Sequence, residues 1–333
     1  MDAKANRAGW WVAGVLGVLA LVAGITVIVW PGTKPAPPGG GGLGTGTARA
    51  TGMGGAERPG TGAGQTQTAS SRLLPGTPRA TTRGTGNAVR PPIGPNERTV
   101  DLGENVTMQL ALIPAGTFTM GTPAGEMGRY SDEGPPHKVT LTKSFYMGVT
   151  EVTQAQWEAV MGHDSNPSYF FTGIDLPVEE VSWDNAMGFC SKLSQKAGKA
   201  CRLPTEAEWE YACRAGTTGQ YYTGDGEDAL KQAGWFKADS ANMPHAVGQK
   251  LSNALGLYDM HGNVWEWCSD WYAEEYPAED QTDPMGPTSG TERVLRGGSW
   301  FNNPLSCRSG IRGKDKPDFR YYYIGFRVVM ETQ

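Results

Sequence analysis

Apolar and polar residues alternate over short runs in the first part of the region that we expect to fold. Residues 108–121 form two such runs, separated by a turn signal at Pro114 and Gly116. Residues 139–142 and 144–149 continue in the same style. Short apolar runs bounded by glycine and proline are typical of β-strands, so the pattern predicts a series of short strands here.

Helices are predicted where a polar side chain can cap the first turn. Thr153 and Gln156 have the spacing of a capping box, in which two side chains satisfy free backbone donors, and a short helix should follow as far as Met161. Thr205 and Glu208 repeat this spacing, so another helix is predicted after Thr205.

The longest predicted helix begins at Ser182, runs to about Lys196 and ends at Gly198. Its apolar face consists of Ala186, Phe189, Cys190 and Leu193. After Gly216 the chain shows only short strand runs among Gly, Asn, Asp and aromatic residues. A domain of this kind has to hold its loops by hydrogen bonds, aromatic packing and metal ions.

An uncharged apolar run, Trp10–Trp30, is about as long as a helix that crosses roughly 30 Å of hydrocarbon, and it predicts a transmembrane helix. Lys4 and Arg7 precede it and Lys34 follows it. This bias predicts a cytoplasmic N-terminus (residues 1–9) and a single-pass protein of a bacterial inner membrane, with its C-terminal domain periplasmic or extracellular. A cleaved signal peptide is the alternative, although the run lacks a clear Ala-x-Ala end.

Composition separates a linker, residues 31–98, from a folded domain, residues 99–333. The linker is rich in Gly, Pro, Thr and Ala, with too few large apolar residues to offset the entropy of ordering, so we expect a disordered tether. Up to Arg98, ten Lys and Arg residues stand against three acidic residues, a net charge of +7, which leaves −12 for the domain. An acidic domain repels phosphate backbones, so no nucleic acid partner is expected.

The stretch 293–308 combines a strand-like run with candidate chemistry. Gly297 and Gly298 let the backbone turn without a Cβ penalty. The turn is followed within a few residues by Ser299, Trp300, Asn302 and Cys307. A reactive pocket could therefore form after the strand.

Several ordered motifs resemble the formylglycine-generating enzyme family, also called sulfatase-modifying factors. They are Ile113–Phe118, Thr150–Thr153, Pro177–Trp183, Arg202–Glu210, Gly256–Trp267 and Ile324–Val328. The resemblance implies a compact α+β fold with little regular secondary structure, related to the C-type lectin fold. It leaves function open, because this fold hosts oxidases, partner modules of other catalytic domains and variable ligand-binding proteins.

The resemblance also locates an active site, with one departure. Family members that convert a sulfatase cysteine to formylglycine bind Cu(I) through two cysteines, and these positions correspond to Asn302 and Cys307. Cu(I) is a soft ion that prefers thiolates, so a carboxamide in place of one sulfur should weaken the site by orders of magnitude. If the chain is nevertheless an oxidase, Cys307, Ser299 and Trp265 are the matching catalytic positions.

A structural role for Cys307 is the alternative. The domain is expected outside the reducing cytoplasm, and its odd number of cysteines leaves at least one unpaired. The family fold should bring Cys268 near the Gly-Gly-Ser strand. We therefore expect a Cys268–Cys307 disulfide, although sequence alone does not fix connectivity.

The resemblance further implies one structural Ca²⁺. Asp259 and Glu266 match family positions that bind through carboxylates, and Gly262 and Val264 match positions that bind through backbone carbonyls. Oxygen donors at alternate positions of a glycine-containing turn suit a hard cation. The alternative is that both carboxylates only accept hydrogen bonds from backbone N–H groups.

Aromatic and amide residues near the C-terminus predict a ligand-binding surface. They are Phe301, Asn302, Asn303, Tyr321, Tyr322 and Tyr323, to which Phe319 adds a further ring. Because strand residues alternate in direction, about half of these side chains should face the core. The set also resembles the variable region of retroelement-diversified binding proteins.

Two functions follow from these observations. The favoured one is a membrane-anchored binding module for a protein or glycan ligand, with a structural Ca²⁺ and without the copper-binding cysteine pair. The alternative is a copper-dependent oxidase that acts on exported sulfatases.

Overall fold

The computed structural model describes residues 96–332, which lie in one compact unit. The predicted transmembrane helix at residues 10–30 and nearly all of the predicted linker lie outside the described residues. None of the helices in residues 96–332 combines the length and the apolar character needed to cross a bilayer.

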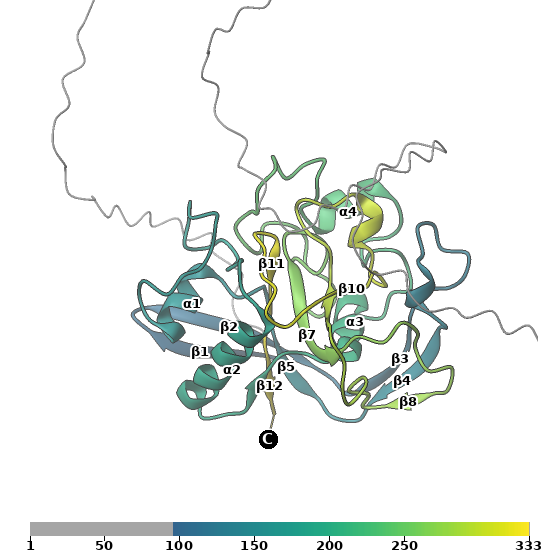
Figure 1. Cartoon of the computed structure of the whole chain (residues 1–333), viewed down its shortest axis with the longest axis horizontal. Coiled ribbons are helices and arrows are strands. Elements are labelled where there is room, and N and C mark those ends of the chain that lie inside the picture. Colours follow the sequence, from purple (N-terminus) through teal and green to yellow (C-terminus); the bar gives the residue numbers. More distant parts are fainter. Residues whose placement is uncertain (1–95, 333) are drawn as a thin grey trace, which may run out of the picture. The chain divides into compact units, whose positions relative to one another are not determined.

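A five-stranded sheet organises the domain (Figure 1). Its antiparallel strands, in spatial order, are β1 (Glu97–Gly103), β2 (Val106–Ile113), β5 (Phe145–Gly148), β12 (Val329–Glu331) and β6 (Cys201–Arg202). The C-terminal strand β12 lies between β5 and β6, so the last residues of the domain complete a sheet that the first residues begin.

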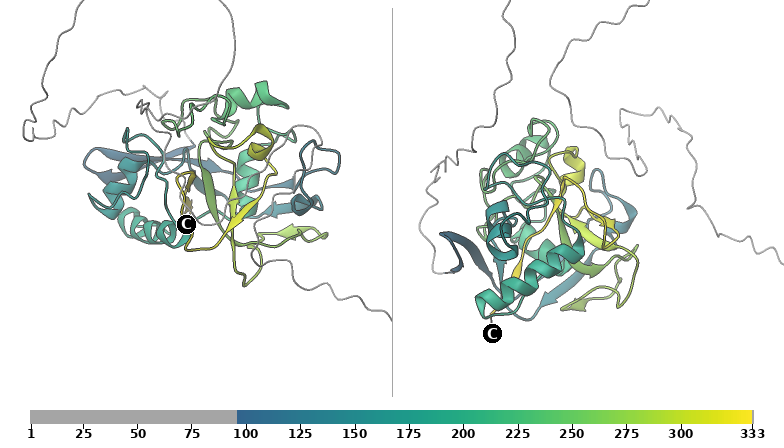
Figure 2. Two further views of the ribbon diagram at one scale, coloured as in Figure 1. Left: turned by 45° about the horizontal axis from the view of Figure 1, so that its top comes forward. Right: turned by 60° about the vertical axis from the view of Figure 1, so that its left-hand side comes forward.

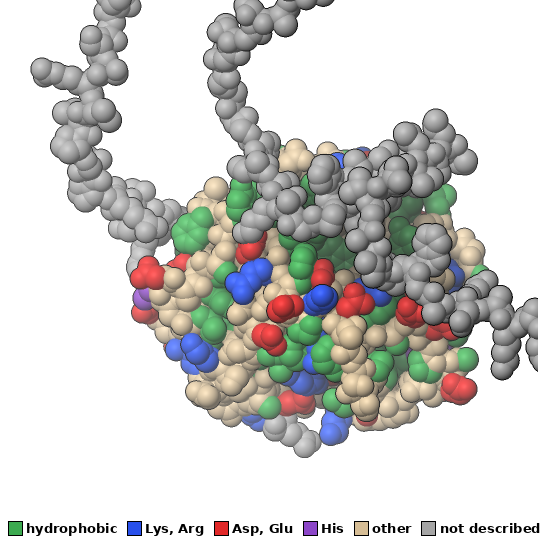
Figure 3. All heavy atoms as spheres, viewed as in Figure 1, with side chains coloured by type: hydrophobic (Ala, Val, Ile, Leu, Met, Phe, Trp, Pro, Cys, Tyr) green, Lys and Arg blue, Asp and Glu red, His purple; other side chains and the backbone are tan. Residues whose placement is uncertain are grey.

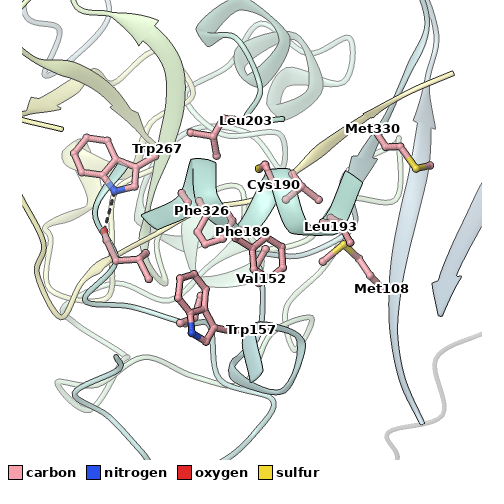
Figure 4. Packing of buried hydrophobic residues seen from close by; sticks show 14 of the residues in the cluster. Met108, Val152, Trp157, Phe189, Cys190, Leu193, Leu203, Trp267, Phe326 and Met330 are labelled. Atoms are coloured by element: carbon pink, nitrogen blue, oxygen red, sulfur yellow. Dashed lines mark hydrogen bonds between the residues drawn. The ribbon is translucent and has the colours of Figure 1, made fainter. Parts of the chain in front are cut away.

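Helices α1 (Gln154–Met161) and α2 (Trp183–Ala197) pack on one face of this sheet, and Figure 2 shows α2 lying along its side. Trp157 of α1 stacks on Phe189 of α2 at 5.7 Å, and Phe326 meets both rings edge-on (Figure 4). These rings fill the core between helices and sheet, where aromatic burial dominates the packing energy.

The predicted helix ends are confirmed. The Thr153 hydroxyl accepts a hydrogen bond from Gln156 N at 3.2 Å, and Thr205 and Glu208 form the second capping box. Gly198 ends α2 in the left-handed conformation, with φ of 63°, which glycine adopts without a Cβ penalty.

The opposite face of the sheet packs against α3 (Glu206–Arg214) and two smaller sheets. One smaller sheet contains, in spatial order, β10 (Gly313–Asp315), β9 (Arg293–Arg296), β7 (Trp265–Trp271) and β11 (Ile324–Gly325). The other contains β3 (Gly116–Met120), β4 (His137–Leu141) and β8 (Gln281–Thr282). A fourth helix, α4 (Glu227–Ala233), and the short 3₁₀ helices η1 (Ser131–Glu133) and η2 (Pro304–Cys307) lie within the long connections.

Buried ion pairs fix the irregular connections. Arg308 donates to both oxygens of Glu133, at 2.6 and 2.8 Å, and so ties the segment after η2 to η1. Arg296 at the end of β9 pairs with Glu210 of α3. All four side chains are fully buried. Removing one partner would leave a buried charge without its counter-ion, which typically lowers the stability of the fold by about 3–5 kcal/mol.

Candidate functional site

The Gly-Gly turn after β9 has the geometry that the sequence predicts. Gly297 and Gly298 have φ values of 92° and 76°, in the left-handed region that favours glycine. A Cβ on Gly298 would lie 2.7 Å from Cys307 Sγ. The second glycine therefore allows the turn to pass directly against η2.

Asn302 lies at the centre of this site. Its Oδ1 accepts hydrogen bonds from Ser299 Oγ at 2.6 Å and from Trp265 Nε1 at 2.8 Å. Because an indole nitrogen only donates, these contacts fix which end of the carboxamide faces Trp265. The structure thus brings Ser299, Trp265 and Asn302 together, with the amide oxygen engaged by two donors.

Cys307 is fully buried beside Asn302. Its Sγ lies 3.9 Å from Ser299 O and 3.7 Å from Asn303 O. The backbone N–H of Asn302 donates to the same Ser299 carbonyl at 3.0 Å and closes the turn between the two residues. Burial raises the pKa of the Cys307 thiol to about 12, so it is protonated at neutral pH and is a poor nucleophile.

The expected disulfide is not formed. All five cysteines lie in the described part of the chain and are free thiols. Cys268 belongs to the core cluster around Trp209, whereas Cys307 packs with Tyr221 and Phe236 in a separate cluster. The pairing of Cys268 with Cys307 was therefore wrong for this structure, because the two thiols are held in different cores.

The predicted calcium ligands lie close together, but one carboxylate already has partners. Arg327 donates to both oxygens of Glu266 at 2.7 Å, and Trp209 Nε1 donates to Oε2 at 2.6 Å. Asp259 accepts from Gly248 N at 2.6 Å through Oδ2, while its Oδ1 is buried without a hydrogen-bond partner. Burial raises the pKa of Asp259 to about 6.

Glu151 is a member of this cluster that the sequence did not indicate. It is fully buried, and its carboxylate receives only contacts of 3.4 Å from Asn263 Nδ2 and Val264 N. Burial, then the charges of Asp259 and Glu266, raise its pKa well above the ordinary value. Glu151 lies within the motif Thr150–Thr153, but that motif did not indicate a metal site, because Glu151 reaches the loop from the segment before α1.

This donor set fits a hard cation. Glu151, Asp259 and Glu266 interact electrostatically with Arg327, and an ion of charge +2 would balance the remaining negative charge. The unpartnered Asp259 Oδ1 would be one ligand of such an ion. Among residues 96–332 no three Asp, Glu, His or Cys side chains are grouped to hold a metal, so backbone carbonyls would have to complete the shell.

The predicted ligand-binding residues form one aromatic face. Phe301 stacks on Tyr323 with centroids 6.1 Å apart, and Tyr321, Tyr322 and Tyr323 pack against one another at 4.6–5.4 Å. Phe301 is 44% exposed. Asn303 is exposed too, and its Oδ1 accepts from Ser306 N at 3.2 Å. Part of the set, including Tyr321 and Tyr323, packs against the core, although these residues precede β11 and do not lie in a strand.

Two rings of this face come from the loop after α1 and were not predicted. Tyr169 lies 5.8 Å from Tyr322, and Phe170 meets Trp300 edge-on at 5.5 Å. The sequence feature that could have predicted them is the run Tyr169–Phe171, three aromatic residues in a loop with little other apolar content. We call the rings of Tyr169, Phe170, Trp300, Phe301, Tyr321, Tyr322 and Tyr323 the aromatic face.

Charge on the visible surface is mixed. Acidic and basic side chains are interspersed in Figure 3, without a continuous basic patch on that side. Lys237 contributes a local cation, with Nζ 5.6 Å from the centre of the Phe301 ring. A cation at this distance from a ring is within the range of cation–π attraction.

Comparison with known proteins identifies the family. The model of the sulfatase-modifying factor enzyme 1-like domain matches residues 99–332. The chain belongs to the sulfatase-modifying factor family. The mouse formylglycine-generating enzyme is 30% identical, over 66% of this chain and 74% of that protein. The serine/threonine-protein kinase pkn1 of Chlamydia pneumoniae is 32% identical, over 67% of this chain and only 38% of the kinase.

A solved structure supports the fold. Treponema denticola variable protein 1 has 33% sequence identity and a TM-score of 0.66, covering 72% of this chain and all of that chain. The proteins that this chain resembles are therefore named a formylglycine-generating enzyme, a serine/threonine-protein kinase and a variable protein. Family membership explains the compact mixed fold, with its few helices and curled sheets, but it does not select one activity.

Proposed function

We propose that this chain is a binding module of the sulfatase-modifying factor family, which holds a protein or glycan ligand on its aromatic face and does not generate formylglycine. The observation that carries the proposal is the environment of Asn302. Its carboxamide takes the position of one copper-binding thiol and is engaged by Ser299 and Trp265. The remaining thiol, Cys307, is buried and protonated.

The aromatic face supports the binding role. Tyr169 and Phe301 are exposed, and the three tyrosines are partly exposed. Aromatic rings on rigid positions contribute large contact areas at low entropic cost, and neighbouring amides add hydrogen bonds. The Asn302 oxygen is used internally, so its Nδ2 is the group available to a ligand. The likeness to Treponema denticola variable protein 1 favours the same interpretation.

We further propose a structural Ca²⁺ at the Asp259 loop. Asp259 and Glu151 would contribute carboxylate oxygens, and Gly262 and Val264 would contribute carbonyl oxygens. The ion would neutralise the buried carboxylates and fix the loop that leads into β7. Glu266 would join the shell only by giving up hydrogen bonds to Arg327.

The N-terminal apolar run supports a proposed location. A helix over Trp10–Trp30 would anchor the chain in a bacterial inner membrane, and residues 31–98 would tether the domain on its outer side. An exported sulfatase would be the substrate only under the alternative oxidase function.

A glycan and protein array tests the binding proposal. The wild-type chain should give saturable binding to at least one arrayed ligand, and replacing Tyr321, Tyr322 and Tyr323 by alanine should abolish it. Unchanged binding by the triple variant would place the ligand elsewhere. A Ser306→Ala variant is the matched control, because this side chain lies near the face without belonging to it.

A further inference from the structure

A cavity of about 520 Å³ lies away from Cys307, beside β8 and the first turn of α3. Its walls include Met120, Trp271, Tyr276 and Met285, together with Asp270 and His137. The volume is within the range of about 300–1,000 Å³ that is typical of small-molecule sites. None of these residues belongs to the aromatic face or to the calcium loop.

Asp270 provides an acceptor without a partner. Its side chain is only 4% exposed, and its Oδ2 accepts from Glu206 N at 2.9 Å and from Ser269 Oγ at 3.0 Å. Within residues 96–332 its Oδ1 has no hydrogen bond. Gly286 has φ of 70° and passes so close that a Cβ there would lie 3.1 Å from Oδ1. The glycine therefore lets the segment around residue 286 form a wall against the carboxylate.

His137 provides a second free acceptor. It is 6% exposed, and its Nδ1 lies 3.1 Å from the carbonyl oxygen of Pro135. Since a carbonyl only accepts, Nδ1 carries the proton, and Nε2 of the neutral ring is an acceptor. No hydrogen bond to Nε2 is formed by the described residues.

Two other charged groups of the cavity, Glu206 and Arg312, are paired with each other, whereas Glu275 is exposed. Arg312 donates to both oxygens of Glu206, at 2.7 and 2.9 Å, and Tyr276 Oη also donates to Glu206. Arg312 also donates to the backbone carbonyls of Asp132 and Ala273. Asp270 forms no salt bridge with Arg312 or with any other described residue, and Arg293 is a nearby cation that interacts with it electrostatically.

We infer that this cavity binds a small organic amine, with its ammonium group on Asp270 Oδ1 and its apolar body against Met120, Trp271, Tyr276 and Met285, while His137 contributes a further acceptor to the cavity lining. Both free polar atoms are acceptors, so the ligand has to bring donors. A positive charge would compensate the buried carboxylate, and apolar and aromatic walls suit a hydrocarbon or aryl body. The inference is independent of the proposed function.

Calorimetric titration of the full chain tests this inference, with phenethylamine as the probe and 2-phenylethanol as its uncharged analogue. Burial, then the charge of Glu206, raises the pKa of Asp270 to about 7, so titration is made at about pH 8 to ionise the carboxylate. The amine should bind at least about tenfold more tightly than the alcohol, and Asp270→Asn should remove that difference. Equal affinity for both probes, or no amine binding up to about 10 mM, would overturn the inference.

A second pair of variants covers the case in which Asp270→Asn does not fold. Met285 lines the cavity but is 74% exposed, so substitution there should not disturb the core. Both substitutions remove the same apolar contact, but only Met285→Lys places an ammonium group beside the cavity, so it should weaken phenethylamine binding by about tenfold more than Met285→Gln does. Equal effects of the two substitutions would contradict the inference. The triple tyrosine variant should bind the amine normally, whatever the outcome for the aromatic face.

Discussion

Trp265 donates its indole N–H to the carboxamide oxygen of Asn302 across 2.8 Å. This hydrogen bond joins the first residue of β7 to the turn that follows β9, and Ser299 reinforces it from the turn itself. A thiol at position 302 would be a much weaker acceptor for both donors. The contact therefore shows that the local structure is built around the amide and does not merely tolerate it.

Asn302→Cys should create a Cu(I) site. The substitution supplies a second thiol at the position that corresponds to the first copper-binding cysteine of the family, and two sulfur donors suit a soft ion. Competition with a chromophoric Cu(I) chelator should show tight binding by the variant, and weak binding by the wild type and by an Asn302→Ser control. Tight binding by the wild type would refute the argument from Asn302. The variant should also lose about 1–2 kcal/mol of stability with the two hydrogen bonds.

Tyr169→Ala should lower the affinity for a ligand found on the array by about tenfold. Tyr169 is 46% exposed and packs against Tyr322, so it extends the aromatic face beyond the residues predicted from sequence. Surface plasmon resonance measures the change. Met285→Ala is the control, because it removes an exposed apolar side chain from a different surface. If both substitutions have the same small effect, the loop after α1 does not take part in binding.

Glu179 should make stability fall as the pH rises. Its Oε1 accepts from Phe170 N at 2.7 Å, its Oε2 is buried without a partner, and burial raises its pKa from 4.5 to about 8. Folding therefore favours the protonated form, so stability is full below about pH 4.5 and is lost as the pH rises towards 8. The loss should be on the order of a few kcal/mol.

Urea unfolding at a series of pH values checks this prediction. Glu179→Gln mimics the protonated acid and should remove most of the slope between about pH 5 and 8. Asp283→Asn, a change at an exposed carboxylate, should leave that slope unchanged. A wild-type protein whose stability stays constant over this range would contradict the assignment of the pH dependence to Glu179.

Calcium should stabilise the domain against heat. Saturating Ca²⁺ should raise the melting temperature by several degrees relative to an EDTA-treated sample, because ion binding to the folded state alone shifts the unfolding equilibrium. Asp259→Asn should remove this increment. Glu266→Gln should instead lower the melting temperature with or without the ion, because it breaks a buried pair with Arg327. A Ca²⁺ effect that survives Asp259→Asn would exclude the proposed site.

Local features of the fold were predictable from sequence. The capping boxes at Thr153 and Thr205 and the left-handed Gly198 depend on contacts within one helix end, and all three are confirmed. The positive φ values of Gly297 and Gly298 are equally local. Helix α4 was missed because its seven residues are too few to show a clear period.

Features that depend on distant segments were not predictable in the same way. Glu151 joins the Asp259 cluster, and Phe170 joins the aromatic face, only because the chain folds back on itself. The Cys268–Cys307 pairing was wrong for the same reason, since the two residues enter different cores. The motifs predicted which residues belong to each site better than they predicted which residues contact one another.

The most direct test of the account is turnover. The purified wild-type chain is incubated with Cu(I), oxygen and a Cys-x-Pro-x-Arg peptide, and the peptide is examined for an aldehyde by mass spectrometry. We predict that the peptide cysteine is recovered unchanged, because Asn302 and the buried Cys307 do not form a Cu(I) site. Formylglycine formed over repeated turnovers by the wild-type chain would show that it is an oxidase and would contradict the assignment to binding alone.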